Sequence, residues 1–156
     1  MSGPPHKELK SRLADHPFFQ GMSGELVDLL VRNATEQSFT TGDLLIREGE
    51  PANEFLLITN GKVALEVVAP DRPRLTIQTI GPGEVLGWSW ITAPYRWRLD
   101  ARALKPTKAI ALEAPMLREA LETRPSDGYQ FLLKLLPVIG QRLENTRMQL
   151  LDIHGV

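Results

Sequence analysis

The sequence of 156 residues contains no cysteine. This absence excludes disulfide bonds, thiolate catalysis and zinc sites with cysteine ligands, and it fits a reducing compartment. No apolar run approaches the roughly 20 residues that a membrane-spanning helix needs, and residues 1–10 lack the apolar core of a signal peptide. We therefore expect a cytoplasmic protein without a membrane partner.

Neither sign of charge is in excess. The chain carries 18 basic and 19 acidic residues, so its formal net charge is −1 at neutral pH. No global field therefore attracts it to nucleic acid or to an anionic membrane. Apolar residues make up 42% and charged residues 24%, which is typical of a soluble globular protein. We expect a single domain spanning residues 1–156.

Motifs typical of catalysis are also missing. His6, His16 and His154 show no spacing typical of metal ligands, and the chain has neither a GxxxxGK[ST] phosphate loop nor a GxSxG motif. Scattered carboxylates such as Glu48 and Glu50 fit turn and surface charges better than an acid–base pair. We predict no catalytic residue, no metal site and no cofactor, and hence a protein that is not an enzyme.

The first part of the chain, residues 1–34, has the pattern of short helices. Leu9 and Leu13 lie four residues apart in a polar segment, which indicates an amphipathic helix. His16-Pro17 ends this helix, because a residue before proline avoids the helical region. Ser23 is a good N-cap for a second helix.

The second part, residues 35–113, has the pattern of short strands. Runs of five to seven residues are separated by turn signals about every ten residues. Asn60-Gly61 is among these signals and predicts a β-hairpin. Such a pattern predicts an antiparallel sandwich or roll.

The third part, residues 114–156, returns to a helical period. Pro115 fits the first turn of a short helix, and Ser126 is predicted to cap a long one. Pro137 should kink that helix or divide it near Leu133. The apolar positions of the long helix follow a heptad spacing, at Leu132, Leu136, Ile139, Leu143, Leu150 and Ile153. This seam predicts either a two-fold dimer or packing on the chain's own β-domain.

All three tryptophans lie in one stretch from Gly83 to Arg102, GEVLGWSWITAPYRWRLDAR. They could fill a pocket as an aromatic cluster, stack on a base or another flat ligand, or anchor a protein partner. The nearby arginines at positions 96, 98 and 102 could be solvated charges in cation–π contact with the tryptophans, or they could bind an anion.

The order of helices, strands and helices, together with three segments at residues 16–30, 40–65 and 81–90, resembles the cyclic-nucleotide-binding domain. That domain is the sensor half of catabolite-activator-type bacterial regulators. HPFFQGMSGELVDLL is similar to the entry segment of that family, and GPGEVLGWSW to the glycine-rich start of its ligand cassette. TTGDLLIREGEPANEFLLITNGKVAL resembles its most typical run, with Gly42, Glu48, Gly49 and Gly61 at turn positions. The resemblance implies a mainly β fold with flanking helices. The implied fold is a double-stranded, jelly-roll-like β-roll with N-terminal helices and a long C-terminal helix.

The resemblance also implies a ligand site. In binding members, main-chain amides at a short helix cradle the phosphate, an arginine contacts its oxygens and a glutamate accepts from the ribose 2′-hydroxyl. Gly87 matches the cassette glycine, whereas Trp88 stands at the position of the glutamate. An indole nitrogen can only donate a hydrogen bond, so that acceptor is lost.

The position of the phosphate-binding arginine depends on the length of the loop. Counting forward from Gly87 places Arg98 there, and counting back from Ala103 places Trp97 there instead. We predict a ligand site formed by Gly87, Trp88, Ser89, Arg96, Trp97 and Arg98.

These observations predict a regulatory module that binds cyclic AMP, cyclic GMP or a related small anion and signals through its C-terminal helix. The alternative is a domain with a tryptophan-filled pocket that acts as a protein-interaction module. The expected partners are the ligand and either a second copy, through the C-terminal helix, or another protein. Regulators of this type carry a helix-turn-helix after the long helix, and the sequence ends at Val156. We expect no nucleic-acid-binding element within this chain, and whether an effector domain follows in a longer protein stays open.

Overall fold

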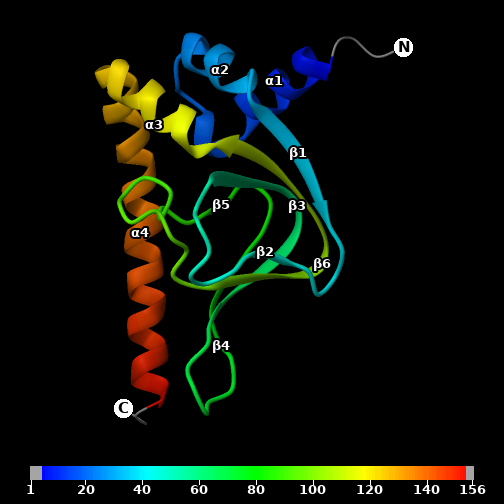
Figure 1. Cartoon of the computed structure of the whole chain (residues 1–156), viewed down its shortest axis with the longest axis vertical. Helices are drawn as coiled ribbons and strands as arrows, with labels where there is room; N and C mark the ends of the chain where they lie inside the picture. The colour runs from blue at the N-terminus through cyan, green and yellow to red at the C-terminus, as the bar shows by residue number, and fades with distance from the viewer. Residues whose placement is uncertain (1–4, 154–156) are drawn as a thin grey trace.

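The computed structural model describes residues 5–153, and the side chains of residues 8–152. The side chains of His6, His154 and the seam residue Ile153 lie outside this range. An antiparallel β-roll forms the centre, short helices lie at one end, and a long helix runs along one side (Figure 1). This arrangement confirms the predicted fold class. Within the described residues, no helix has the length and apolarity that crossing a membrane requires.

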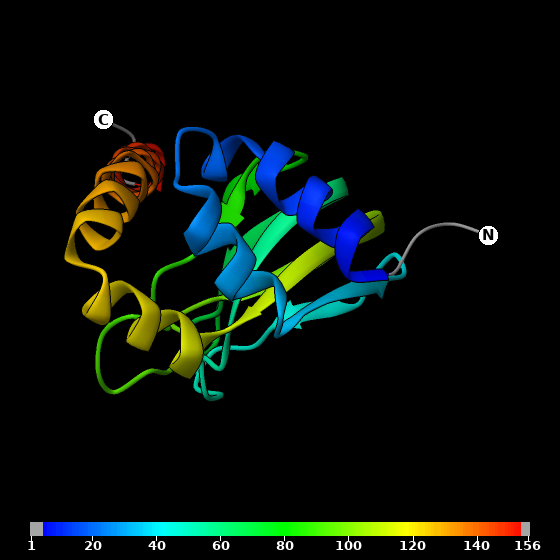
Figure 2. The same ribbon diagram turned by 90° about the horizontal axis from the view of Figure 1, so that it is seen from above.

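The N-terminal helices follow the capping and breaking signals of the sequence. Helix α1 spans Pro5–Asp15, the 3₁₀ turn η1 spans Pro17–Phe19, and helix α2 spans Gly24–Val31. Ser23 is the N-cap of α2, because its hydroxyl accepts a hydrogen bond of 3.2 Å from the amide of Leu26. In the view from above, α1 and α2 lie across one end of the strands (Figure 2).

The strands form one antiparallel sheet in the order β1-β6-β3-β4, with β2 paired to β6 and β5 paired to β3. Two strands of 14 residues, β3 and β6, pair along most of their length and form the body of the roll. Their bounds, in chain order, are β1 Ala34–Phe39, β2 Leu44–Ile46, β3 Glu54–Val67, β4 Leu75–Ile80, β5 Val85–Leu86 and β6 Asp100–Glu113.

The predicted hairpin at Asn60-Gly61 is wrong. The chain does not reverse there, because β3 continues through both residues and pairs with β6 on either side of them. Gly61 has a φ of +101°, and the register of the β3–β6 ladder shifts around it. The glycine therefore serves a bulge inside one long strand, and the strands are fewer and longer than the turn spacing suggested.

The C-terminal helices are α3, Ala114–Thr123, and α4, Pro125–Ile153. Helix α4 begins at Pro125, so Ser126 lies inside it and is not its N-cap as predicted. A proline in the first position of a helix has no amide hydrogen to leave unpaired. The helix is not divided at Pro137, which lies within the continuous element.

An aromatic cluster joins α4 to the roll and to the N-terminal helices. Phe131 of α4 lies 4.9 Å from Phe18, 5.6 Å from Phe55 and 5.7 Å from Trp90, measured between ring centroids. Most of these pairs have edge-to-face geometry, which is favourable for aromatic rings. The first part of α4 is therefore part of the core, and the rest of the helix extends along the roll past β4 (Figure 1).

Candidate functional site

The three tryptophans lie in the loop between β5 and β6, and the structure gives each a different environment. Trp90 is fully buried between Phe55 and Phe131. Its indole N–H has no acceptor among the described residues. Trp97 is 6% exposed, and Trp88 is partly exposed. Trp90 thus belongs to the core, and only the other two can take part in a site.

Gly87 and Trp97 are packed directly against each other. Gly87 has a φ of +62°, and a Cβ atom added to it would lie 3.0 Å from Cζ3 of Trp97. A side chain at this position would be strained by the backbone conformation and crowded by the indole. The glycine therefore allows the two ends of the loop to meet.

A small cavity of about 50 Å³ lies between this loop and α4. Its lining residues are Ile46, Gly87, Trp88, Ser89, Trp97, Arg98, Leu99 and Arg142. Five of the six residues predicted from the sequence are thus brought to one place, and no carboxylate is among them. The lining residues together carry two guanidinium groups, a hydroxyl and two indole N–H groups, a set that suits an anion.

Arg96 is the predicted residue that the structure places elsewhere. Its Nη1 donates a 2.9 Å hydrogen bond to the carbonyl oxygen of Gly49. With Glu48 and Gly49 it borders an open surface depression of about 380 Å³, which Trp97 and Arg98 also line. Of the two arginines that flank Trp97, only Arg98 reaches the small cavity.

Arg142 of α4 is the site residue that the sequence did not reveal. It is 6% exposed, and its guanidinium carbon lies 5.1 Å from the ring centroid of Trp88. Its Nε donates a 3.4 Å hydrogen bond to Oε1 of Gln78. Burial lowers the pKa of Arg142 to about 10, although the charge of Glu84 acts in the opposite direction. The side chain is therefore still a cation at neutral pH.

The cation–π contact with a tryptophan is made by Arg142 and not by the arginines predicted to make it. Arg102 instead donates from Nε to Glu66 at 3.2 Å and from Nη1 to the carbonyl of Gly42 at 3.1 Å. Nothing in the sequence distinguishes Arg142 from Arg147, which is exposed on the same helix. Only the position of α4 beside the roll separates the two.

Main-chain hydrogen bonds hold the loop between β5 and β6, residues 87–99, against the turn after β2. Gly49 N donates to Trp97 O at 2.8 Å, and Trp97 N donates to Glu50 O at 2.9 Å. Ala52 N donates to Tyr95 O at 2.7 Å. These bonds fix the backbone on both sides of Trp97, and with it the direction from which Arg98 approaches the cavity.

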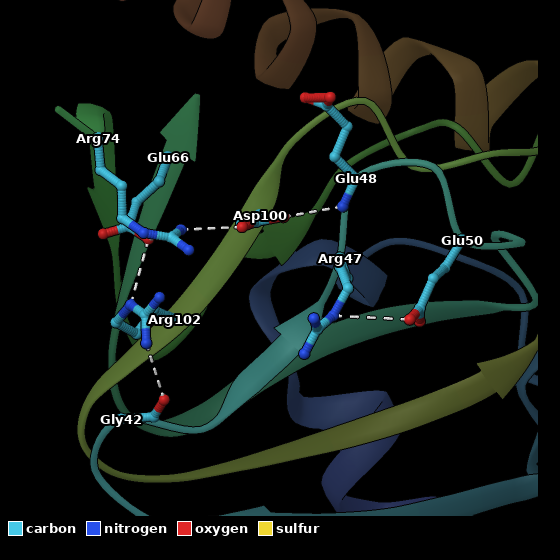
Figure 3. Close-up of polar contacts among 8 residues, drawn as sticks. All are labelled: Gly42, Arg47, Glu48, Glu50, Glu66, Arg74, Asp100 and Arg102. Carbon is cyan, nitrogen blue, oxygen red and sulfur yellow. Dashed lines mark hydrogen bonds and ion pairs between the residues drawn. The ribbon is translucent and has the colours of Figure 1, made fainter. Parts of the chain in front are cut away.

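A network of two carboxylates and two guanidiniums supports the far end of the loop (Figure 3). Asp100 accepts 2.8 Å from the amide of Glu48 and 2.9 Å from Arg74, while Glu66 accepts 3.1 Å from Arg74 and 3.2 Å from Arg102. Burial alone would raise the pKa of Asp100, but the amide and Arg74 outweigh it, so the pKa is lowered. Asp100 is therefore charged, two residues after Arg98.

No group of three or more histidine, aspartate, glutamate or cysteine residues that could hold a metal ion occurs in the described part of the chain. The side chains around the cavity carry positive charge or hydrogen-bond donors, which disfavour a cation. The arrangement can bind an anion, because two guanidinium groups line the cavity.

Comparison with known proteins identifies the family of the fold. The model of the cyclic nucleotide-binding domain family matches residues 36–124. A CRP-like cAMP-activated global transcriptional regulator of Mycobacterium tuberculosis is 28% identical over 141 residues, which cover 90% of this chain and 61% of the regulator. The chain thus spans about three fifths of the length of that relative.

Two solved structures are similar over almost the whole chain. One is a candidate cyclic nucleotide-binding protein from Geobacter metallireducens, with a TM-score of 0.75, 26% identity, and coverage of 92% of this chain and 99% of that one. The other is the N-terminal domain of a transcriptional regulator from Streptomyces coelicolor, with a TM-score of 0.64, 26% identity, and coverage of 91% and 94%. The Mycobacterium and Streptomyces relatives are both transcriptional regulators.

Proposed function

Since the chain belongs to the cyclic-nucleotide-binding domain family, we propose that it is a regulatory module that senses a small anionic ligand, a cyclic nucleotide or a related phosphate. One observation carries the proposal. Gly87 and Ser89 from the start of the loop and Arg98 from its end line one cavity, and Arg142 of α4 lines the same cavity. The name of the Mycobacterium regulator, which is cAMP-activated, supports the same class of ligand.

Helix α4 is the element through which a bound ligand acts on the rest of the molecule. Arg142 touches the binding loop through Trp88, and the same helix reaches the core through Phe131. A ligand that interacts differently with two positions of α4 shifts the balance between them. Residues 1–34, 35–113 and 114–156 thus act as one sensor unit.

A second candidate function rests on the size of the cavity. About 50 Å³ is little space, because Trp97, Trp88 and Arg142 occupy the surrounding volume. A domain with its pocket filled in this way serves as a protein-interaction module, with the exposed side of α4 as the contact surface. This reading needs no ligand.

Calorimetric titration of the whole chain with cyclic AMP and with cyclic GMP tests the first function. We expect saturable binding that Arg98→Ala weakens about tenfold or more, because a charge-assisted contact to the phosphate is lost. Arg96→Ala is the matched control, since that arginine lies two residues away and outside the cavity. Equal losses in both variants would contradict the assignment of the site to Arg98.

Tryptophan fluorescence distinguishes the second function. With a filled pocket, neither nucleotide gives heat, and the emission without ligand is blue-shifted and resistant to quenchers. A quenchable component that becomes protected when nucleotide is added would contradict the filled pocket.

A further inference from the structure

The lining of the small cavity is cationic and rich in hydrogen-bond donors. Arg98 approaches from the loop and Arg142 from α4, and Ser89 and Trp88 add a hydroxyl and an indole N–H. No carboxylate lines the small cavity, so no charged acceptor is available within it. A ligand that fits this lining has to supply the acceptors and the negative charge itself.

The guanidinium of Arg142 has hydrogen-bonding capacity to spare. Its Nε contacts Gln78 at 3.4 Å, its carbon lies 5.1 Å from the centroid of Trp88, and it forms no ion pair within the described part of the chain. Glu84, the carboxylate whose charge acts on Arg142, accepts a 2.8 Å hydrogen bond from the amide of Gly81. The N–H groups of a guanidinium lie in its plane, so stacking on an indole leaves the Nη groups available.

We propose that the site selects a phosphate monoester, with its dianionic phosphate held between Arg98 and Arg142, over a cyclic phosphodiester. The inference rests on the proposed sensing function and narrows its ligand class. A monoester carries close to two negative charges at neutral pH and three terminal oxygens, whereas a cyclic phosphodiester carries one charge and two free oxygens. Two guanidiniums without a carboxylate match the first and are undercompensated by the second.

The dimensions of the site are consistent with this division. The cavity of about 50 Å³ has room for a phosphate group in place of a few water molecules. Arg142 also lines a second cavity of about 230 Å³ under α4, whose walls include Phe18, Ile80 and Val138. The organic part of the ligand lies outside the small cavity, and the phosphate bridges the roll and α4 through the two arginines.

Calorimetry with matched nucleotides tests this proposal on the whole chain at pH 7.5. The probes are 5′-AMP against 3′,5′-cyclic AMP, and 5′-GMP against 3′,5′-cyclic GMP. The methyl phosphate esters of 5′-AMP and 5′-GMP, which are acyclic but carry a single charge, separate charge from ring closure. We expect the monoester to bind about tenfold or more tightly than both singly charged forms.

Arg142→Gln should remove this preference, because the loss of one guanidinium weakens binding of the monoester by a larger factor than binding of the singly charged forms. Arg98→Gln should weaken all forms. Circular dichroism and the midpoint of thermal unfolding check that each variant folds, and Arg142→Lys, which keeps the charge, should retain part of the preference.

Cyclic forms that bind at least as tightly as the monoesters, or a preference that survives in Arg142→Gln, would overturn the inference and leave the sensing function in place. If none of the nucleotides binds, the sensing function itself fails.

Discussion

At the scale of single residues, a few side chains and two glycines decide how closely segments of the backbone approach one another. Trp88 gives the cavity a donor and an aromatic face, and Arg142 covers that face. Gly87 allows Trp97 to approach the backbone, and Gly61 allows β3 to pass close to β6. Exchanging one of these residues changes what the backbone or the cavity can accommodate.

Gly61 provides the sharpest residue-scale prediction. An added Cβ would overlap Oγ1 of Thr107 and lie 2.6 Å from the carbonyl oxygen of Pro106, and the backbone has a φ of +101°. We expect Gly61→Ala to lower the free energy of unfolding by about 3 kcal/mol or more, measured by urea denaturation. Gly42→Ala is the control, because its φ is +95° with no heavy atom within 4 Å. It should cost only about 1–2 kcal/mol, and equal losses would show that the close approach is unimportant.

At the scale of elements, the molecule depends on connections between segments that are distant along the chain. The turn after β2 holds the loop before β6 by main-chain hydrogen bonds, and a charged network ties β3 and β6 to the segment that precedes β4. A histidine joins the N-terminal helices to β3. Each of these connections makes a prediction about stability.

Both carboxylates of the charged network, Glu66 and Asp100, are buried, and the nearby ion pair of Arg47 and Glu50 is exposed (Figure 3). Asp100 is buried and bonded to Arg74 and to the amide of Glu48, whereas Glu50 pairs with Arg47 at the surface. We expect Asp100→Ala to cost about 2–3 kcal/mol, because it leaves the amide and the guanidinium without their acceptor. The partial exposure of Arg74 keeps the loss below that of a fully buried pair.

Glu50→Ala should change the free energy of unfolding by less than about 0.5 kcal/mol, because an exposed pair contributes little. Chemical denaturation of both variants measures the difference. Similar losses would mean that Asp100 acts only as a surface charge.

His16 makes the stability of the N-terminal layer dependent on pH. Its Nε2 donates 3.0 Å to the carbonyl of Ile58 and its Nδ1 accepts 3.2 Å from the amide of Phe18, so the neutral ring satisfies both partners. Burial lowers the pKa of His16 from 6.5, although the bond to Ile58 opposes this. Below pH 6.5 the unfolded chain binds a proton that the folded chain does not, so stability falls as the pH falls toward the folded-state pKa.

Urea denaturation at pH 7.5 and at pH 5.5 measures this dependence. We expect His16→Asn to be less stable at pH 7.5 and to lose less stability on acidification than the wild type. An unchanged difference between the two pH values would assign the effect to other groups.

At the scale of the whole molecule, α4 both lines the small cavity and presents an apolar surface. Phe131 and Leu135 are buried in the core, and Arg142 is buried against Trp88 in the loop between β5 and β6. On its other side the helix exposes the predicted seam positions Leu132, Leu136, Leu143 and Leu150. The cavity and the exposed leucines therefore share one helix, which is the arrangement that the proposed coupling needs.

We expect two copies of the chain to associate through this seam. Leu143 is 70% exposed, and Leu143→Lys should raise the dissociation constant of the dimer about tenfold or more, because a cation then lies at the apolar contact. Sedimentation velocity measures the change. Glu144→Ala, one residue away, should leave association unaltered, and a wild-type chain that is monomeric at high concentration would refute the seam.

The sequence by itself determined the division into helices, strands and helices, the N-cap at Ser23, and most residues of the ligand cavity. These features depend on local signals, since periodicity, capping and turn chemistry act over a few neighbouring residues. Gly87, Trp88 and Ser89 are consecutive, so a sequence motif that contains one of them places all three in the same part of the fold.

Only the tertiary structure decided the features that require distant segments to meet. Gly61 looks like a hairpin turn until β6 is known to pair with both halves of β3. Arg142 resembles any helical arginine until α4 is placed beside Trp88. Arg96 is distinguished from Arg98 by its hydrogen bond to Gly49, whereas Arg98 lines the small cavity. Burial and pairing depend on contacts across the whole fold, and a local pattern carries no information about which partner a side chain will find.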